Sequence, residues 1–302
     1  MTQTDANRTE IGVFATGSLM IGPDAVVSVV GSRPIAIVTR GEIFIQGALN
    51  AIPDDTVTNQ GNGGGFSSPV ISSVDKSGKG PGAGGAPTGS VGPGGGAYCG
   101  KGGNATGGKP YGSSAISPLM GGSSGALGGR DAGLAGAGGG AIQLVSGKAI
   151  TLTPLAKINV GGAGGEWLAG GGGSGGAVLL EAPTVTIQGV IAANGGGGGA
   201  NSITDSMGKS ATPNATAAPG AMNSSTENPG GGGSADTIID GAAGQYTGTS
   251  VTLAGPYGGG GGGGAGRIRI NTSSGQASIT GVLSPSATTS CFSQGKLLAA
   301  GQ

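Results

Sequence analysis

The two cysteines are the residues whose chemistry the sequence addresses most directly. Cys99 and Cys291 are the only cysteines among 302 residues. In an oxidising compartment they can form one disulfide, and a bridge closing so long a loop removes much entropy from the unfolded chain. The alternative is two unpaired thiols. The sequence leaves both states open.

The absence of histidine narrows the enzyme classes that this chain can belong to. Without histidine there is no Ser-His-Asp or Cys-His catalysis and no common general base at neutral pH. The string Gly-x-Ser-x-Gly occurs at residues 121–125 and 172–176, as chance predicts when 75 residues are glycine. Gly208-Lys209-Ser210 ends like a phosphate-binding loop, but Ile203 occupies the position of the required earlier glycine. We therefore expect neither an enzyme nor a bound cofactor.

Carboxylates are the remaining groups that could act as a site. Asp54 with Asp55, and Asp236 with Asp240, could bind Ca²⁺ together with backbone carbonyls. The alternative, which we favour, is that they are solvated loop acids, so no metal site is expected. A polysaccharide-active enzyme would place acids beside Arg267 and Arg269, and none stands there.

Aromatic side chains in the glycine-rich part are the candidate contact residues. An aromatic ring beside glycine can present a stacking face to a sugar or a receptor loop, or it can pin its loop to the rest of the protein. Trp167 is the first candidate. The further candidates are Tyr98, Tyr111, Tyr246 and Tyr257.

The elements that must position these residues are four apolar islands with alternating hydrophobicity. They span residues 35–51, 142–160, 178–193 and 268–283, and residues 18–30 have a similar pattern of apolar residues. Each reads as three short strands separated by small breaks, and three contain an aligned string of the type Ile-x-Gly-x-Leu, with Ile191 in place of the leucine in the third island. Constant islands joined by very unequal connections are typical of solenoids. The sequence predicts one all-β domain over residues 1–302, a parallel β-solenoid with rungs near 18–51, 142–160, 178–193 and 268–283.

Two long glycine-rich insertions, residues 61–140 and 195–265, connect the rungs. The apolar core of a few rungs is too small to offset the ordering entropy of so many loop residues. The insertions are therefore either flexible linkers or extended polyglycine II helices that hydrogen-bond to one another. The tracts lack the Ser, Glu and Lys of solvated linkers and run directly into the strands, which favours polyglycine II.

Charge and hydropathy limit the partners. The chain has 14 basic and 14 acidic residues, hence no net charge that would attract nucleic acid. No stretch approaches the roughly 20 apolar residues of a membrane span. A near-neutral surface favours association, and exposed β edges at the solenoid ends offer a route to it.

Two resemblances bear on location. Residues 173–187 (GSGGAVLLEAPTVTI), the string AANGGGGG at 192–199 and GAGRIRINT at 264–272 resemble glycine-rich cell-surface proteins and lipoproteins of myxobacteria and related bacteria. That resemblance implies repeat architecture and a place on the bacterial exterior. Residues 266–271 (GRIRIN) are also similar to tip adhesins of T-even-type phage tail fibres, which implies receptor-binding loops on a phage particle.

The combined expectation is a non-catalytic extracellular structural protein, self-associating as a component of a cell surface, fibre or matrix. The first alternative is an adhesin or phage-type receptor-binding tip that uses its glycine-rich loops to contact a cell-surface glycan or receptor. The second alternative is a polysaccharide-active β-helix enzyme. The polar first ten residues are expected to act as a cap or a donated strand.

Overall fold

The protein is an all-β chain of parallel strands. The computed structural model describes residues 10–54, 60–70, 75–129, 133–202, 207–222, 228–248 and 255–297, and contains strands but no helix in these ranges. The first nine residues, expected to act as a cap, lie outside them. The strands are β1 (Gly12–Thr16), β2 (Leu19–Ile21), β3 (Val26–Ser28), β4 (Ile35–Thr39), β5 (Ile43–Ile45), β6 (Ala48–Asn50), β7 (Ala141–Ser146), β8 (Ala149–Leu152), β9 (Lys157–Asn159), β10 (Ala177–Glu181), β11 (Thr184–Ile187), β12 (Val190–Ala192), β13 (Arg267–Thr272), β14 (Ser278–Ile279), β15 (Val282–Ser284) and β16 (Phe292–Lys296).

The strands form three parallel sheets that the chain visits in rotation. The first sheet has the order β1-β4-β7-β10-β13-β16, the second β14-β11-β8-β5-β2 and the third β15-β12-β9-β6-β3. Every third strand therefore joins the same sheet, one position further along. The prediction of an all-β parallel fold is confirmed at this level.

Register between rungs follows from the alternation of apolar residues. Ile37, Leu144, Leu180 and Ile270 pair across successive strands of the first sheet and are all buried. The second and third sheets have equivalent columns. Those columns are Ile45, Leu152, Ile187 and Ile279, and Leu49, Ile158, Ile191 and Leu283. Burying each of these side chains contributes about 1.5–3 kcal/mol, and a one-residue slip would expose whole columns.

The glycine within the Ile-x-Gly-x-Leu string is explained by steric constraints. A Cβ on Gly47 would lie 2.3 Å from the carbonyl oxygens of Gly22 and Ala25, and a Cβ on Gly281 would lie 2.1 Å from that of Gly189. Glycine is therefore required where the corner between the second and third strand stacks on the previous corner. In the second island, four residues, 153–156, separate β8 from β9, whereas two separate β11 from β12.

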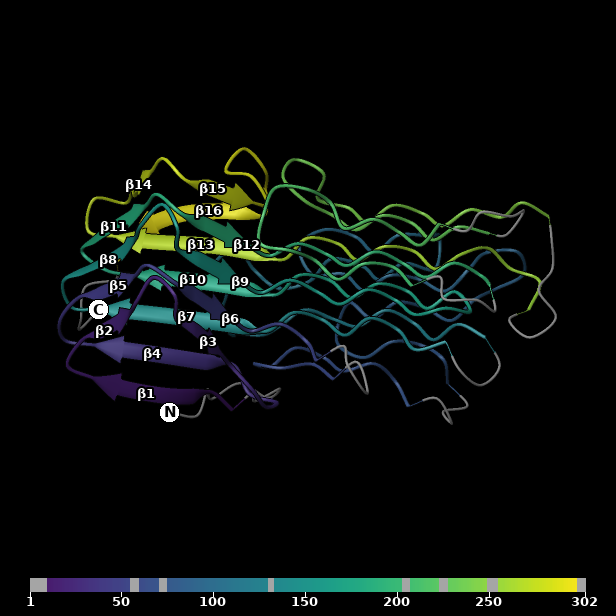
Figure 1. Ribbon diagram of the computed structural model, residues 1–302, viewed down its shortest axis with the longest axis horizontal. Helices are drawn as coiled ribbons and strands as arrows, with labels where there is room; N and C mark the ends of the chain where they lie inside the picture. Colours follow the sequence, from purple (N-terminus) through teal and green to yellow (C-terminus); the bar gives the residue numbers. More distant parts are fainter. Residues whose placement is uncertain are drawn as a thin grey trace.

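All the long connections leave from one corner of the sheet stack. They follow the third strand of a triplet and end at the first strand of the next, namely residues 51–140 after β6, 160–176 after β9 and 193–266 after β12. Figure 1 shows that they run out and back side by side, away from the sheets, as a long bundle of extended segments.

Backbone hydrogen bonds hold this bundle together with a period of three residues. The segment 258–264 directs successive N–H groups to three different neighbouring segments, with N···O distances of 2.8–2.9 Å. The acceptors recur every third residue. Gly259 and Gly262 donate to Gln245 and Ala242, Gly260 and Gly263 to Gly199 and Gly196, and Gly261 and Gly264 to Pro93 and Gly96.

The Cα atoms of the same segment face three further neighbours. A Cβ on Gly259 or Gly262 would lie 2.1 or 1.9 Å from the carbonyl oxygen of Pro229 or Gly232. A Cβ on Gly260 or Gly263 would meet residues 170 or 173, and one on Gly261 or Gly264 would meet residues 103 or 100. The segment is thus enclosed by six others at distances that only glycine permits.

Candidate functional site

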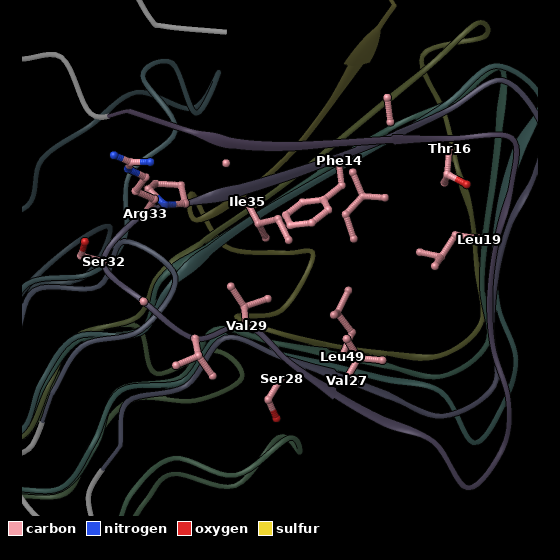
Figure 2. Close-up of a pocket in the computed structure, with 16 residues that line it drawn as sticks. Phe14, Thr16, Leu19, Val27, Ser28, Val29, Ser32, Arg33, Ile35 and Leu49 are labelled. Atoms are coloured by element: carbon pink, nitrogen blue, oxygen red, sulfur yellow. The ribbon is translucent and has the colours of Figure 1, made fainter.

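The N-terminal end of the sheet stack contains an open apolar cavity of about 840 Å³. Phe14 of β1, Leu19 of β2 and Val27 of β3 line it together with Val29, Ile35 and Leu49. Figure 2 shows side chains from all three sheets directed toward this common space. The cavity is the continuation of the apolar core beyond its first complete layer.

The cavity is open because β1, β2 and β3 are end strands. Among the described strands each has a partner on one side only, namely β4, β5 and β6. Phe14 pairs with Ile37 and so continues the inward column of the first sheet, yet Phe14 is 63% exposed while Ile37 is buried. An edge strand also presents unpaired N–H and C=O groups. The end therefore offers both apolar surface and unpaired backbone.

The C-terminal end, which we call the closed end, also finishes in edge strands, β14, β15 and β16, but it differs in the side chains that cover the core. β16 adds a sixth strand to the first sheet, and Phe292 packs against the core. Gln294 pairs with Ile270, so it takes an inward position; its Oε1 accepts a hydrogen bond from the Ala277 N–H at 2.7 Å. A polar side chain thus ends the column that Phe14 leaves open at the other end.

The two cysteines are joined. Cys99 and Cys291 form a disulfide across a sequence separation of 192, and both side chains are buried beside Ala265. The bond ties the glycine-rich bundle to the turn that precedes β16. Its role in this structure is therefore to connect the bundle to the closed end of the sheets.

Tyr98 and Tyr111 do not present free ring faces. Their rings stack with centroids 4.6 Å apart, and the Arg267 guanidinium carbon lies 5.6 Å from the centre of the Tyr98 ring. Arg267 also donates to the Tyr111 carbonyl at 2.9 Å. Burial raises the pKa of Tyr98 to about 12, raises that of Tyr111 and lowers that of Arg267. The cluster pins a loop onto β13.

The other candidate aromatic residues lie elsewhere in the bundle. Tyr257 is buried, its carbonyl accepts from Asn228 Nδ2 at 3.1 Å, and burial raises its pKa to about 12. Trp167 is half-buried, next to Leu168 and Ala169, whose φ angles are positive. Tyr246 is 46% exposed, the highest value of the five candidates. The structure does not bring the five together as one surface.

The serines of the two Gly-x-Ser-x-Gly strings have backbone and packing partners. Ser123 Oγ donates to the Tyr111 hydroxyl, and Ser174 Oγ donates to the Ala97 carbonyl, each at 3.1 Å. Both serines are fully buried. These contacts link neighbouring segments of the bundle.

The acidic residues likewise have structural partners or lie apart. Asp240 Oδ1 accepts from the Lys101 N–H at 2.8 Å, and the Asp236 N–H donates to Ser284 Oγ at 2.7 Å. Asp54 faces Gln60 in a short antiparallel bridge, and Asp55 lies outside the described residues. Within the part of the chain that the structure describes, no three His, Cys, Asp or Glu side chains gather as a metal site.

Sequence reasoning missed the residues that line the open cavity. Their signal was present in the apolar residues Phe14, Leu19, Val27 and Val29, which precede the first long island. A second missed feature is a set of exposed apolar side chains in the bundle, namely Val70, Met207 and Met222.

Comparisons with protein-family models, with curated proteins and with solved structures found no match to this chain. The search for a helix long and apolar enough to cross a membrane, made over the described residues, found none.

Proposed function

We propose that the three sheets close into a β-solenoid and that the glycine-rich segments form a bundle of polyglycine II helices. The closure is supported by the rotation of the chain through the three sheets and by the single apolar core that all three share. The helix type is supported by the period of three in the contacts of residues 258–264, since polyglycine II has three residues per turn. Such a bundle is a stiff rod fixed to one corner of the solenoid.

On this architecture the protein is a non-catalytic structural component of an extracellular assembly, and it associates with further copies of itself. The open apolar end of the sheet stack is the observation that carries this proposal, because an apolar cavity beside three unpaired strand edges favours association. The disulfide favours an extracellular place, since such bonds persist in oxidising compartments. A bacterial surface or matrix is the setting that we propose.

Sedimentation of the purified chain over a wide concentration range tests the self-association. The expected result is a concentration-dependent shift from monomer to a defined assembly that survives moderate salt, because the contact is apolar. A chain that remains monomeric at every concentration contradicts the proposal. Negative-stain electron microscopy of the same samples then shows whether the assemblies are discrete rods or continuous fibres.

An adhesin is the second candidate, and exposed apolar side chains far from the sheets favour it. Met222 is 85% and Tyr246 46% exposed. Met222 follows Ala221, whose N–H donates to Gly198, and Tyr246 follows Gln245, whose N–H donates to Pro229. Both side chains thus lie in the outer part of the bundle, whereas Asn194 and Ser284 mark its inner end. Exposed apolar groups at the end of a rod are suited to contact a receptor or glycan.

Paired substitutions separate the adhesin from the structural role. Met222→Ala with Tyr246→Ala removes the exposed apolar groups at the outer turns. Ile238→Ala is the matched control, because Ile238 is 62% exposed but lies close to the sheets, two residues from Asp236 and its bond to Ser284. An adhesin loses cell or glycan binding in the double variant alone. Equal binding by both variants contradicts the adhesive surface.

A further inference from the structure

We propose that two copies of the chain meet head to head through their open N-terminal ends, about a twofold axis that passes beside Phe14. The inference rests on the proposed self-association and specifies its surface and symmetry. The product is a closed dimer in which the two bundles point in opposite directions, because pairing β1 with β1 of the second copy reverses the strand direction, and the bundle extends away from the sheets roughly along the line of β1 (Figure 1).

The difference between the two ends disfavours head-to-tail stacking. Head-to-tail contact would set the polar Gln294 cap of one copy against the apolar cavity of the next. The unsatisfied apolar surface lies at the N-terminal end, so the same end of a second copy is the surface that matches it. By composition, residues 1–9 offer little apolar surface that could match the cavity, since Met1 and Ala6 are their only apolar residues.

Strand lengths fit a twofold axis perpendicular to β1. Such an axis places β1 against β1 of the second copy, and it places β2 against the second copy's β3. β1 has five residues, and β2 and β3 have three each, so every strand meets an edge of its own length. A twofold interface of this kind uses one patch twice and closes after two copies.

Backbone directions then set the register. The Gly12 N–H donates to the Pro34 carbonyl, so by strand alternation Phe14 and Thr16 also direct their backbone groups toward β4. Val13 and Ala15 are left with backbone groups that point away from the sheet. Pairing Val13 with Ala15 of the second copy uses these groups and places the two Phe14 residues opposite each other in a non-hydrogen-bonded pair. The two rings would close both cavities together.

Charge at the rim is compatible with this contact. Residues 10–34 contain one base, Arg33, and two acids, Glu10 and Asp24. Arg33 forms an exposed ion pair with Glu10 of the same chain. In the proposed register Glu10 lies across from Ser18 of the second copy, so the two Arg33–Glu10 ion pairs lie at opposite ends of the β1 contact and each stays within its own chain. The two Asp24 turns, between β2 and β3, approach each other, but their carboxylates are exposed and screened by solvent.

Disulfide trapping of a Phe14→Cys variant tests the geometry. Cα atoms in a non-hydrogen-bonded antiparallel pair lie about 4.5 Å apart, within the range that a disulfide spans. Since Cys99 and Cys291 are already bonded to each other, the thiol introduced at position 14 is the reactive one. Mild oxidation should yield a covalent dimer. Val282→Cys, on the exposed part of β15 at the closed end, is the matched control and should stay uncoupled.

A charge placed in the cavity gives an independent readout. Phe14→Lys should weaken dimerisation about 100-fold or more, because it buries an unpaired charge. Met20→Lys, on the outward face of the same layer where Met20 is 70% exposed, should change it less than about 3-fold. Phe14 already meets solvent in the single chain, so the substitution leaves the monomer folded.

The outcomes separate this inference from the proposed function. Coupling at position 14, with selective loss of dimers in Phe14→Lys, supports both. Association that persists in Phe14→Lys, or that couples thiols at Val282 instead, overturns the head-to-head geometry and leaves self-association standing. Absence of association at all concentrations overturns both.

Discussion

A single methyl group added at Gly262 should disrupt the bundle, whereas the same change at its neighbour Gly232 should not. The two residues lie in neighbouring segments, but only Gly232 has room for a Cβ atom. A Cβ on Gly262 would lie 1.9 Å from the Gly232 carbonyl oxygen, whereas a Cβ on Gly232 would meet nothing nearer than the Ala218 carbonyl at 3.6 Å. Neither residue has a positive φ, so the backbone conformation itself admits alanine at both.

The magnitude follows from the displacement that the methyl group demands. Real Cβ atoms essentially never lie within 3.0 Å of another atom, so the neighbouring backbone must move by about 1.1 Å. That segment is held by its own hydrogen bonds, and overpacking of this kind typically costs about 1–3 kcal/mol, with larger values where backbone must move. At Gly232 the same substitution removes only unfolded-state freedom, which stabilises by about 0.4–1 kcal/mol.

Thermal and denaturant unfolding of the two variants beside the parent chain provide the assay. Gly262→Ala should lower the midpoint temperature by about 2–4 °C for each kcal/mol lost, and Gly232→Ala should leave it unchanged or raise it slightly. Equal effects of the two substitutions would refute the reasoning, because they would mean that the close approach at Gly262 does not exist. A fully tolerated Gly262→Ala would do the same.

Three further changes test the contacts that attach the bundle to the sheets. Reducing the Cys99–Cys291 bond should destabilise the chain by up to about 5 kcal/mol from the loop entropy of a 192-residue separation, seen as a lower denaturant midpoint; an unchanged midpoint contradicts this. Because burial raises the pKa of Tyr98 from 10.0 to about 12, stability that is fully present below pH 10 should be lost as the pH rises through 12, seen as a falling denaturant midpoint; a Tyr98 phenolate absorbance with its midpoint near pH 10 is the opposing result. Arg267→Lys should cost about 1–3 kcal/mol, because lysine cannot reproduce the paired bonds to Tyr111 and the contact with Tyr98, whereas Arg40→Lys on the surface should be silent in the same unfolding assay.

The parallel all-β fold was predictable because its cause is local. Alternation within residues 35–51 or 178–193 already determines which side chains face inward. The corner glycines Gly47, Gly189 and Gly281 were visible as an aligned string, since each stacks on an earlier corner.

The remaining features depend on contacts that no local pattern records. Tyr98 is buried by Tyr111 and by Arg267, which lies far along the chain, so its ring could not be distinguished from an exposed one such as that of Tyr246. The closed end depends on Gln294 taking an inward position, and a polar residue there resembles a residue on the outer face. Within a run of seven glycines, no residue type indicates which carbonyl each one faces.

Amide hydrogen exchange in residues 259–264 reports directly on whether the bundle is ordered, because an ordered bundle has hydrogen-bonded glycine amides. Each N–H there donates to a carbonyl of a neighbouring segment at 2.8–2.9 Å. We expect protection comparable to that of strand amides in β10 and β13, with no difference between successive glycines. Exchange at the rate of an unstructured glycine-rich peptide, while β10 and β13 remain protected, would contradict it.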